Sequence, residues 1–259
     1  MTQAERRLFL IRSLINERTE YKELRIPPDA AEQRRLLRSL VNVRPPWEAD
    51  AAFLTVQDDY LRQDLAERGI VRVDELTPVS ADLYLWQGDI TRLQCGAIVN
   101  AANSGMTGCY IPCHTCIDNC IHTYAGVQLR LDCAGLMTQQ GCEEPVGQAK
   151  ITKAYNLPCD YVLHTVGPIA QGRVTAEDQR LLASCYRACF TLAAQRGVES
   201  LAFCCISTGV FHFPHRRAAE IAVETVRHCK EETGSGMKVI FNVFKDTDRE
   251  IYQQLLRAD

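Results

Sequence analysis

The stretch Ile98-Val99-Asn100-Ala101-Ala102-Asn103 decides how the rest of the chain is interpreted. It begins as an apolar strand and ends in two asparagines three residues apart, with small residues between them. An asparagine amide both donates and accepts hydrogen bonds, so it can fix a hydroxyl group of a ligand in either orientation. Asparagines at the end of a strand also make turns, and from this stretch alone both interpretations stay open.

On both sides of this stretch, short strand-like runs alternate with helices. Strands are predicted at residues 83–86, 97–99, 149–154, 161–165, 200–205 and 238–244. Apolar residues at helical spacing predict two helices between the last three strands, and residues 117–139 also have a helical pattern. This alternation predicts a sheet between two layers of helices, with ligands held at the carboxyl ends of the strands.

The first 78 residues show a helical pattern instead. Apolar stripes predict three helices, the second starting at a capping box of Asp29 and Glu32 and the third spanning Ala51 to Arg68 before Gly69. This segment carries no chemical motif. We therefore predict a helical N-terminal extension of residues 1–78, packed on a main domain of residues 79–259.

Composition limits the classes of function. The chain has 259 residues, a net charge of −3 and a pI of about 6.1, so no overall electrostatic attraction to nucleic acid is expected. The N-terminus lacks a long unbroken apolar run, so neither a secretory signal nor a membrane span is expected. We therefore expect a cytoplasmic protein whose 13 cysteines are thiols or metal ligands.

The densest motif is the Cys/His loop, residues 109–116, with the sequence Cys-Tyr-Ile-Pro-Cys-His-Thr-Cys. Thiolates with an imidazole favour zinc over hard ions, and zinc takes about four such ligands. With three protein ligands, one coordination position stays open for water or substrate. Two alternatives remain: a redox pair of Cys113 and Cys116, and a cluster of thiols that binds no metal.

Two further loops follow predicted strands. In Ile206-Ser207-Thr208-Gly209-Val210-Phe211-His212-Phe213-Pro214, successive N–H groups can bind a diphosphate, and Pro214 suits the first turn of the next helix. The loop matches neither a Rossmann fingerprint nor a Walker loop. In Gln87-Gly88-Asp89-Ile90-Thr91, the aspartate can accept a hydrogen bond from an adenine amine or cap a turn.

Taken together, these motifs resemble the macrodomain family from about Asp82 to the C-terminus. The motifs that match in order and spacing are Gly88-Asp89-Ile90-Thr91, Ile98 to Asn103, Ile117-Asp118-Asn119-Cys120-Ile121-His122 with Ala125-Gly126, His164-Thr165-Val166-Gly167-Pro168, and Ser207 to Pro214. The resemblance implies an α/β fold of three layers, α/β/α, with a mixed central sheet, and ADP-ribose as ligand.

The chain departs from the common hydrolase branch of that family at one place. Where that branch carries a glycine triplet, this chain has the longer Cys/His loop. The loop and the helical extension resemble a zinc-containing microbial subgroup. That resemblance implies zinc bound by Cys109, His114 and Cys116, with the role of Cys113 left open.

The resemblance also implies roles for the remaining motif residues. Asp89 and Ile90 are expected to hold the adenine, and Asn103 the distal ribose, with Asn100 supporting the loop. The residues expected to bind the diphosphate and flank the ribose are Ser207, Thr208, Gly209, Val210 and Phe211. Asp118, with Asn103, is the expected catalytic pair, because a carboxylate beside the metal can orient or deprotonate the attacking water. Zinc would lower the pKa of that water or clamp the substrate.

The function expected from these roles is zinc-dependent removal of mono-ADP-ribose from modified protein side chains, most simply acidic residues in ester linkage. The expected partners are ADP-ribose and the mono-ADP-ribosylated protein, with no nucleic acid and no membrane. The alternative is a reader that binds ADP-ribose without turnover and carries a structural zinc. An RNA-binding domain is disfavoured by the acidic pI.

Overall fold

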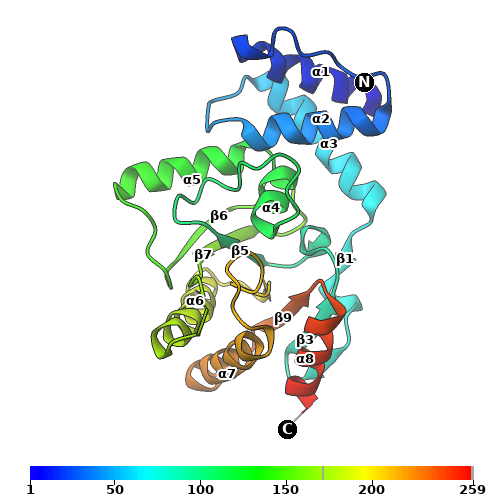
Figure 1. The fold of residues 1–259 in the computed structure, drawn as a ribbon. Coiled ribbons are helices and arrows are strands. Elements are labelled where there is room, and N and C mark those ends of the chain that lie inside the picture. Colours follow the sequence, from blue (N-terminus) through cyan, green and yellow to red (C-terminus); the bar gives the residue numbers. More distant parts are fainter. Residues whose placement is uncertain (171, 258–259) are drawn as a thin grey trace.

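A seven-stranded sheet in the order β2-β3-β9-β8-β5-β7-β6 forms the centre of the fold. The computed structural model describes residues 1–170 and 172–257 (Figure 1). The strands of the sheet are β2 (Pro78–Ser80), β3 (Leu83–Gln87), β5 (Ala97–Ala102), β6 (Ala149–Lys153), β7 (Tyr161–Val166), β8 (Ser200–Phe203) and β9 (Lys238–Val243). The five inner strands run parallel, and both edge strands are antiparallel to their neighbours. The sheet is therefore mixed, as predicted.

Strand β5 is an inner strand of the sheet, between β8 and β7. Ala97, Ile98 and Val99 are fully buried, which is typical of an inner parallel strand covered on both faces. In register with β7, Asn100 lies opposite His164. A polar pair is thereby fixed inside the core, two residue pairs before the carboxyl ends of the two strands.

Helices cover both faces of the sheet (Figure 1). On one face, α4 (Ile117–Ala125) contacts β5 and α5 (Val127–Gln140) contacts β6. On the other, α6 (Ala176–Gln195) packs on α7 (His215–Thr233), and α7 on α8 (Asp246–Arg257), which contacts β2, β3 and β9. The predicted three-layer α/β/α fold is confirmed.

The stretch predicted as helical over residues 117–139 is helical in the structure, where Gly126 divides it into α4 and α5. Gly126 has φ +103°, a conformation that side chains larger than glycine rarely adopt. A Cβ atom there would lie 2.7 Å from Nε2 of Gln57, a residue of the N-terminal extension. The break lets the Gln57 side chain accept a hydrogen bond from the N–H of Val127 at 2.9 Å. Helix α8 was not predicted at all.

The N-terminal extension consists of α1 (Gln3–Asn16), α2 (Ala30–Val43) and α3 (Ala51–Arg68), with a short 3-10 helix η1 (Thr19–Tyr21). The helices bury their own apolar cluster, to which Val127 of α5 also belongs. Asp29 caps α2 through the N–H groups of Ala31 and Glu32, but the return bond of a capping box is not among the contacts of the described residues.

Small elements connect the extension to the sheet. Strand β1 (Val71–Arg72) pairs in parallel with β4 (Leu93–Gln94), and two 3-10 helices lie nearby, η2 (Val73–Glu75) and η3 (Ile90–Arg92). Strand β2 begins at Pro78, so the division drawn after residue 78 falls within it. The division into two domains stays a prediction. No helix in the described ranges is both long and apolar enough to cross a membrane.

Candidate functional site

A cavity of about 660 Å³ opens at the carboxyl ends of β5, β8 and β9. This is the end of the sheet at which ligands were expected. The predicted site residues that line it are Asn103, Cys109, His114, Cys116, Asp118, Ser207, Thr208, Gly209, Val210 and Phe211. Segments more than a hundred residues apart in the chain are therefore brought together around one space.

Asp118 lies at the wall of this cavity, in the first turn of α4, and is 5% exposed. Asn100 Nδ2 donates to Asp118 Oδ1 at 2.8 Å, and Asn103 Nδ2 donates to Asp118 Oδ2 at 3.3 Å. Both asparagines of residues 98–103 thus orient the carboxylate of Asp118. Burial raises the pKa of Asp118 to about 6, although the bonds from both asparagines and the charge of Arg130 oppose that shift.

The two asparagines differ in their access to the cavity. Asn100 is fully buried and also contacts His164 Nδ1 at 3.1 Å, which suits the expected supporting role. Asn103 lines the cavity, yet its amide is engaged within its own loop. Its Nδ2 donates to the carbonyl of Gly108 at 3.2 Å, and its Oδ1 accepts from the N–H of Gly105 at 3.0 Å. Asn103 therefore holds the loop and Asp118 in a fixed relation.

His122 lies one turn along α4 from Asp118 and is 3% exposed. Burial and the nearby His164 and Arg130 hold the pKa of His122 well below its usual range, so the ring is neutral. Among the described residues neither ring nitrogen has a hydrogen-bond partner, and Asp118 Oδ1 lies 3.6 Å from Nε2. A Cβ atom on Gly108 would lie 2.8 Å from this ring. His122 thus packs under the loop that begins at Gly108.

The Cys/His loop brings Cys109, His114 and Cys116 together at the rim of the cavity. One ligand atom from each lies within 4.8 Å of the others, and Cys109 Sγ is 3.5 Å from His114 Nδ1. Two thiols and an imidazole suit zinc, and three protein ligands would leave one coordination position for water or substrate. Burial raises the pKa of Cys116 to about 12, and a bound Zn²⁺ would deprotonate such a thiol outright. The residues present therefore fit a zinc ion.

Cys113 does not join this group. Its Sγ lies 3.2 Å from Ser39 Oγ and 3.4 Å from the carbonyl oxygen of Arg35, both on helix α2. Cys113 has φ +55°, a left-handed conformation that turns its side chain away from the other two thiols of the loop. The question that the sequence left open is answered: this thiol faces the N-terminal extension. That geometry also disfavours a redox pair of Cys113 with Cys116.

A second cluster, of His122, Cys133 and His164, is fully buried in the core beneath Asp118. Both nitrogens of His164 are engaged, Nδ1 with Asn100 and Nε2 with Thr152 Oγ1 at 2.9 Å. Because both ring nitrogens of His164 are hydrogen-bonded, the ring has no lone pair left for a metal ion. We therefore interpret this cluster as a hydrogen-bonded part of the core rather than a metal site.

The strand-to-helix loop after β8 presents free N–H groups to the cavity. Among the described residues, no acceptor takes the N–H groups of Gly209, Val210 and Phe211. The N–H of Thr208 differs from the expectation, because it donates to the carbonyl of Cys205 at 3.4 Å. Pro214 is the N-cap residue of α7, one position before the first turn. Three adjacent donors before a helix N-terminus suit an anionic ligand.

Asp89 and Ile90 are not among the residues that line the cavity in the described part of the chain. Asp89 caps η3 by accepting from the N–H of Thr91 at 3.0 Å, and it pairs with Arg68 at 3.1 Å. Ile90 is buried. The turn-capping interpretation of Asp89 is thus present in the structure, and the adenine-binding roles of both residues stay predictions.

Residues of β9 and of the segment after it line the cavity although sequence reasoning did not select them. They are Asn242, Phe244, Lys245 and Asp248. Phe244 is 78% exposed, which is unusual for a large aromatic side chain. The rule that ligands lie at the carboxyl ends of strands applies to β9 as well, so it would have pointed to Phe244.

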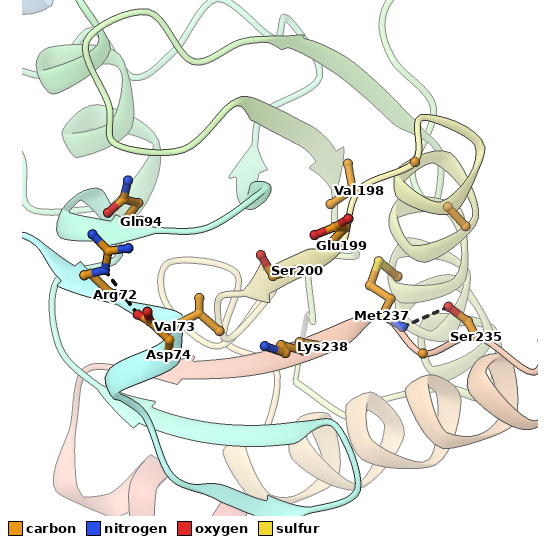
Figure 2. A pocket seen from close by; sticks show the side chains of 13 residues that line it. Arg72, Val73, Asp74, Gln94, Val198, Glu199, Ser200, Ser235, Met237 and Lys238 are labelled. Carbon is orange, nitrogen blue, oxygen red and sulfur yellow. Dashed lines mark hydrogen bonds and ion pairs between the residues drawn. The ribbon is translucent and has the colours of Figure 1, made fainter.

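Another cavity, of about 670 Å³, lies at the opposite end of the sheet, where β8 and β9 begin (Figure 2). Arg72 and Asp74 at its edge form an ion pair at 3.2 Å, so those charges are already matched. Ligands of parallel sheets bind at the carboxyl ends of strands. We therefore place the functional site in the cavity around Asp118.

Comparisons with known proteins agree with this architecture. Residues 99–222 match the family described as Macro domain. A protein of Treponema medium named Protein-ADP-ribose hydrolase is 57% identical over 260 residues, covering 99% of this chain and 100% of that protein. A protein of the same name from Staphylococcus aureus (strain MRSA252) is 48% identical, covering 97% of this chain and 95% of its own.

A solved structure gives the same result. The Trypanosoma brucei macrodomain in complex with ADP-ribose has a TM-score of 0.66 and 30% identity, covering 85% of this chain and 94% of its own. The identities to full-length relatives extend beyond the cavity to both ends of the chain. On these grounds the chain belongs to the macrodomain family.

Proposed function

We propose that this protein is a zinc-dependent hydrolase that removes mono-ADP-ribose from modified protein side chains. The observation that carries the proposal is that one cavity is lined by Asp118, by the Cys/His loop and by residues 209–211, whose N–H groups have no acceptor among the described residues. The names of the similar proteins of Treponema medium and Staphylococcus aureus support the activity.

Binding of ADP-ribose in this cavity would use two kinds of contact. The N–H groups of Gly209, Val210 and Phe211 would bind the diphosphate, helped by the N-terminus of α7. The exposed ring of Phe244 would stack on the adenine at the other side of the cavity. The diphosphate would then direct the distal ribose toward Asn103 and Asp118.

The chemical step would depend on Asp118. Asn100 and Asn103 hold its carboxylate in one orientation, and burial disfavours its hydration, so it is suited to orient and accept a proton from an attacking water. A zinc ion bound by Cys109, His114 and Cys116 would supply a positive charge that polarises a water or holds the substrate near the scissile bond. His122 packs behind the carboxylate and takes no proton.

The linkage that this arrangement favours is an ester to an acidic side chain. A carboxylate leaves without needing a proton, because its pKa lies near 4. One base is therefore enough for such a substrate, whereas an alcohol or amine leaving group would need a general acid as well.

The proposal is tested with purified full-length protein and a mono-ADP-ribosylated protein as substrate. We expect release of free ADP-ribose, detected by mass spectrometry, when the linkage is to glutamate or aspartate. Binding of ADP-ribose without release from any modified protein would instead identify a reader, and the hydrolase proposal would fail.

Gly209→Val tests the binding half of the proposal. A Cβ atom on Gly209 would meet nothing within 4 Å among the described residues, so the fold has room for the side chain. The added isopropyl group would occupy space beside the N–H groups meant for the diphosphate. We expect calorimetry to give a Kd for ADP-ribose at least about tenfold weaker, a loss of about 1.4 kcal/mol, with an unchanged melting temperature. Equal affinity would place the diphosphate elsewhere.

A further inference from the structure

Helix α2 of the N-terminal extension turns a polar face toward the Cys/His loop. Arg35, Arg38, Ser39 and Asn42 fall at positions i, i+3, i+4 and i+7, which share one side of a helix. Each of them contacts the loop through its side chain or its carbonyl oxygen. The apolar residues of α2, such as Leu37 and Leu40, pack in the core of the extension.

Asn42 makes the most buried of these contacts, being 1% exposed. Its Oδ1 accepts a hydrogen bond from the N–H of Cys113 at 2.8 Å, and its Nδ2 donates to Thr123 Oγ1 of α4 at 2.9 Å. Cys113 is the residue held in the left-handed conformation, with φ +55°. Such a conformation costs free energy in a residue with a side chain, so it persists where neighbouring contacts hold it. The hydrogen bond to Asn42 holds Cys113 in this conformation, one residue before His114.

Arg38 contacts the loop from the next turn of the same helix. Its Nη2 donates to the carbonyl oxygen of His114 at 2.8 Å and to Asn119 Oδ1 at 3.1 Å. Asn119 in turn donates from Nδ2 to the carbonyl oxygens of Cys109 at 3.2 Å and Ile111 at 3.0 Å. The backbone at Cys109 and Ile111 is therefore connected to α2 through Asn119, and the backbone at His114 is connected to it directly.

We infer that helix α2 is part of the metal site, with Asn42 and Arg38 as positioning residues that hold the Cys/His loop in the geometry that binds zinc. The inference rests on the proposed zinc site and gives the N-terminal extension a purpose. Residues that orient metal ligands raise affinity because the site is already formed before the ion arrives, and their loss typically weakens binding about 10- to 100-fold.

The test compares zinc affinity among full-length variants by competition with a chromophoric chelator. Asn42→Ala removes the acceptor for the Cys113 N–H, and Arg38→Ala removes the donor to His114. Arg34→Ala is the matched control: it removes an equal charge from an exposed position of the same helix, with no contact to the loop among the described residues. We expect Kd for zinc to rise about 10- to 100-fold in the first two variants only.

Two further measurements separate positioning from general damage to the fold. Kd for ADP-ribose should stay near that of the wild type, because the diphosphate loop does not contact α2 among the described residues. The visible absorption of bound Co²⁺, which reports the ligand geometry, should change in Arg38→Ala even if Asn42→Ala fails to fold. Wild-type zinc affinity in Arg38→Ala and in any folded Asn42→Ala would overturn the inference. A wild-type protein that binds no zinc would instead overturn the metal site itself.

Discussion

Replacing Asp118 with alanine should reduce kcat for release of ADP-ribose by about 10²- to 10⁴-fold, the range typical of a lost general base. Affinity for free ADP-ribose should change little, since the N–H groups that would bind the diphosphate belong to another loop, residues 209–211. The measurement is single-turnover release from a modified protein, together with calorimetric binding of ADP-ribose.

Alanine is the better substitution here because it leaves both neighbouring amides with a partner. Asn100 Nδ2 keeps His164 Nδ1 at 3.1 Å, and Asn103 Nδ2 keeps the carbonyl of Gly108 at 3.2 Å. Asparagine at position 118 would direct an NH₂ group at one of these donors and would create a buried conflict. A loss of activity in the alanine variant is therefore a loss of the carboxylate rather than of the surrounding structure.

Asp160→Ala serves as the control for this experiment. Asp160 is an exposed aspartate immediately before β7, at the opposite end of that strand from the cavity. Its removal changes net charge by the same amount and should leave kcat unchanged. Full activity in Asp118→Ala would contradict the role of Asp118 as general base. Catalysis would then depend on the Cys/His loop alone.

The sequence was most informative where burial dictates residue type. Strand β5 was predicted because Ile98 and Val99 must be apolar at the centre of a covered sheet, and most of the other strands followed from the same requirement. Small edge strands such as β2 were missed, since three residues with one face exposed give no periodic signal. Helix α8 was missed although Asp248, Tyr252 and Leu256 recur every four residues.

The site was predicted only in part, because spacing identifies the residue types of a loop but not their directions. Cys113 and Cys116 are equivalent in sequence, and only the left-handed backbone at Cys113 directs its thiol to α2. The contacts of the polar face of α2 were not predicted, since nothing in its own sequence shows that a loop about seventy residues away covers it. At Asp89 the structure contains the local cap with Thr91 that the sequence also allowed, and the adenine-binding role stays a prediction.

Cys116→Ser should separate metal binding from folding more clearly than any other substitution in the loop. Cys116 is the N-cap residue of α4, and its Sγ accepts from the N–H of Asn119 at 3.4 Å. Serine is a preferred N-cap residue, so the helix and Asp118 in its first turn should be retained. Serine is a poor zinc ligand, since zinc sites use thiolate, imidazole and carboxylate groups. Zinc affinity should therefore fall by more than the roughly 100-fold expected for a supporting residue.

Cys113→Ser is the matched control, because it makes the same chemical change three residues away in a thiol that faces α2. We expect elemental analysis to give one zinc per chain in the wild type and in Cys113→Ser, and little in Cys116→Ser. ADP-ribose release should follow the zinc content across the three proteins, while melting temperatures stay within a few degrees, since the large core does not depend on this loop. A Cys116→Ser protein that keeps full activity without zinc would show that the metal is structural, and Asp118 would then act without it.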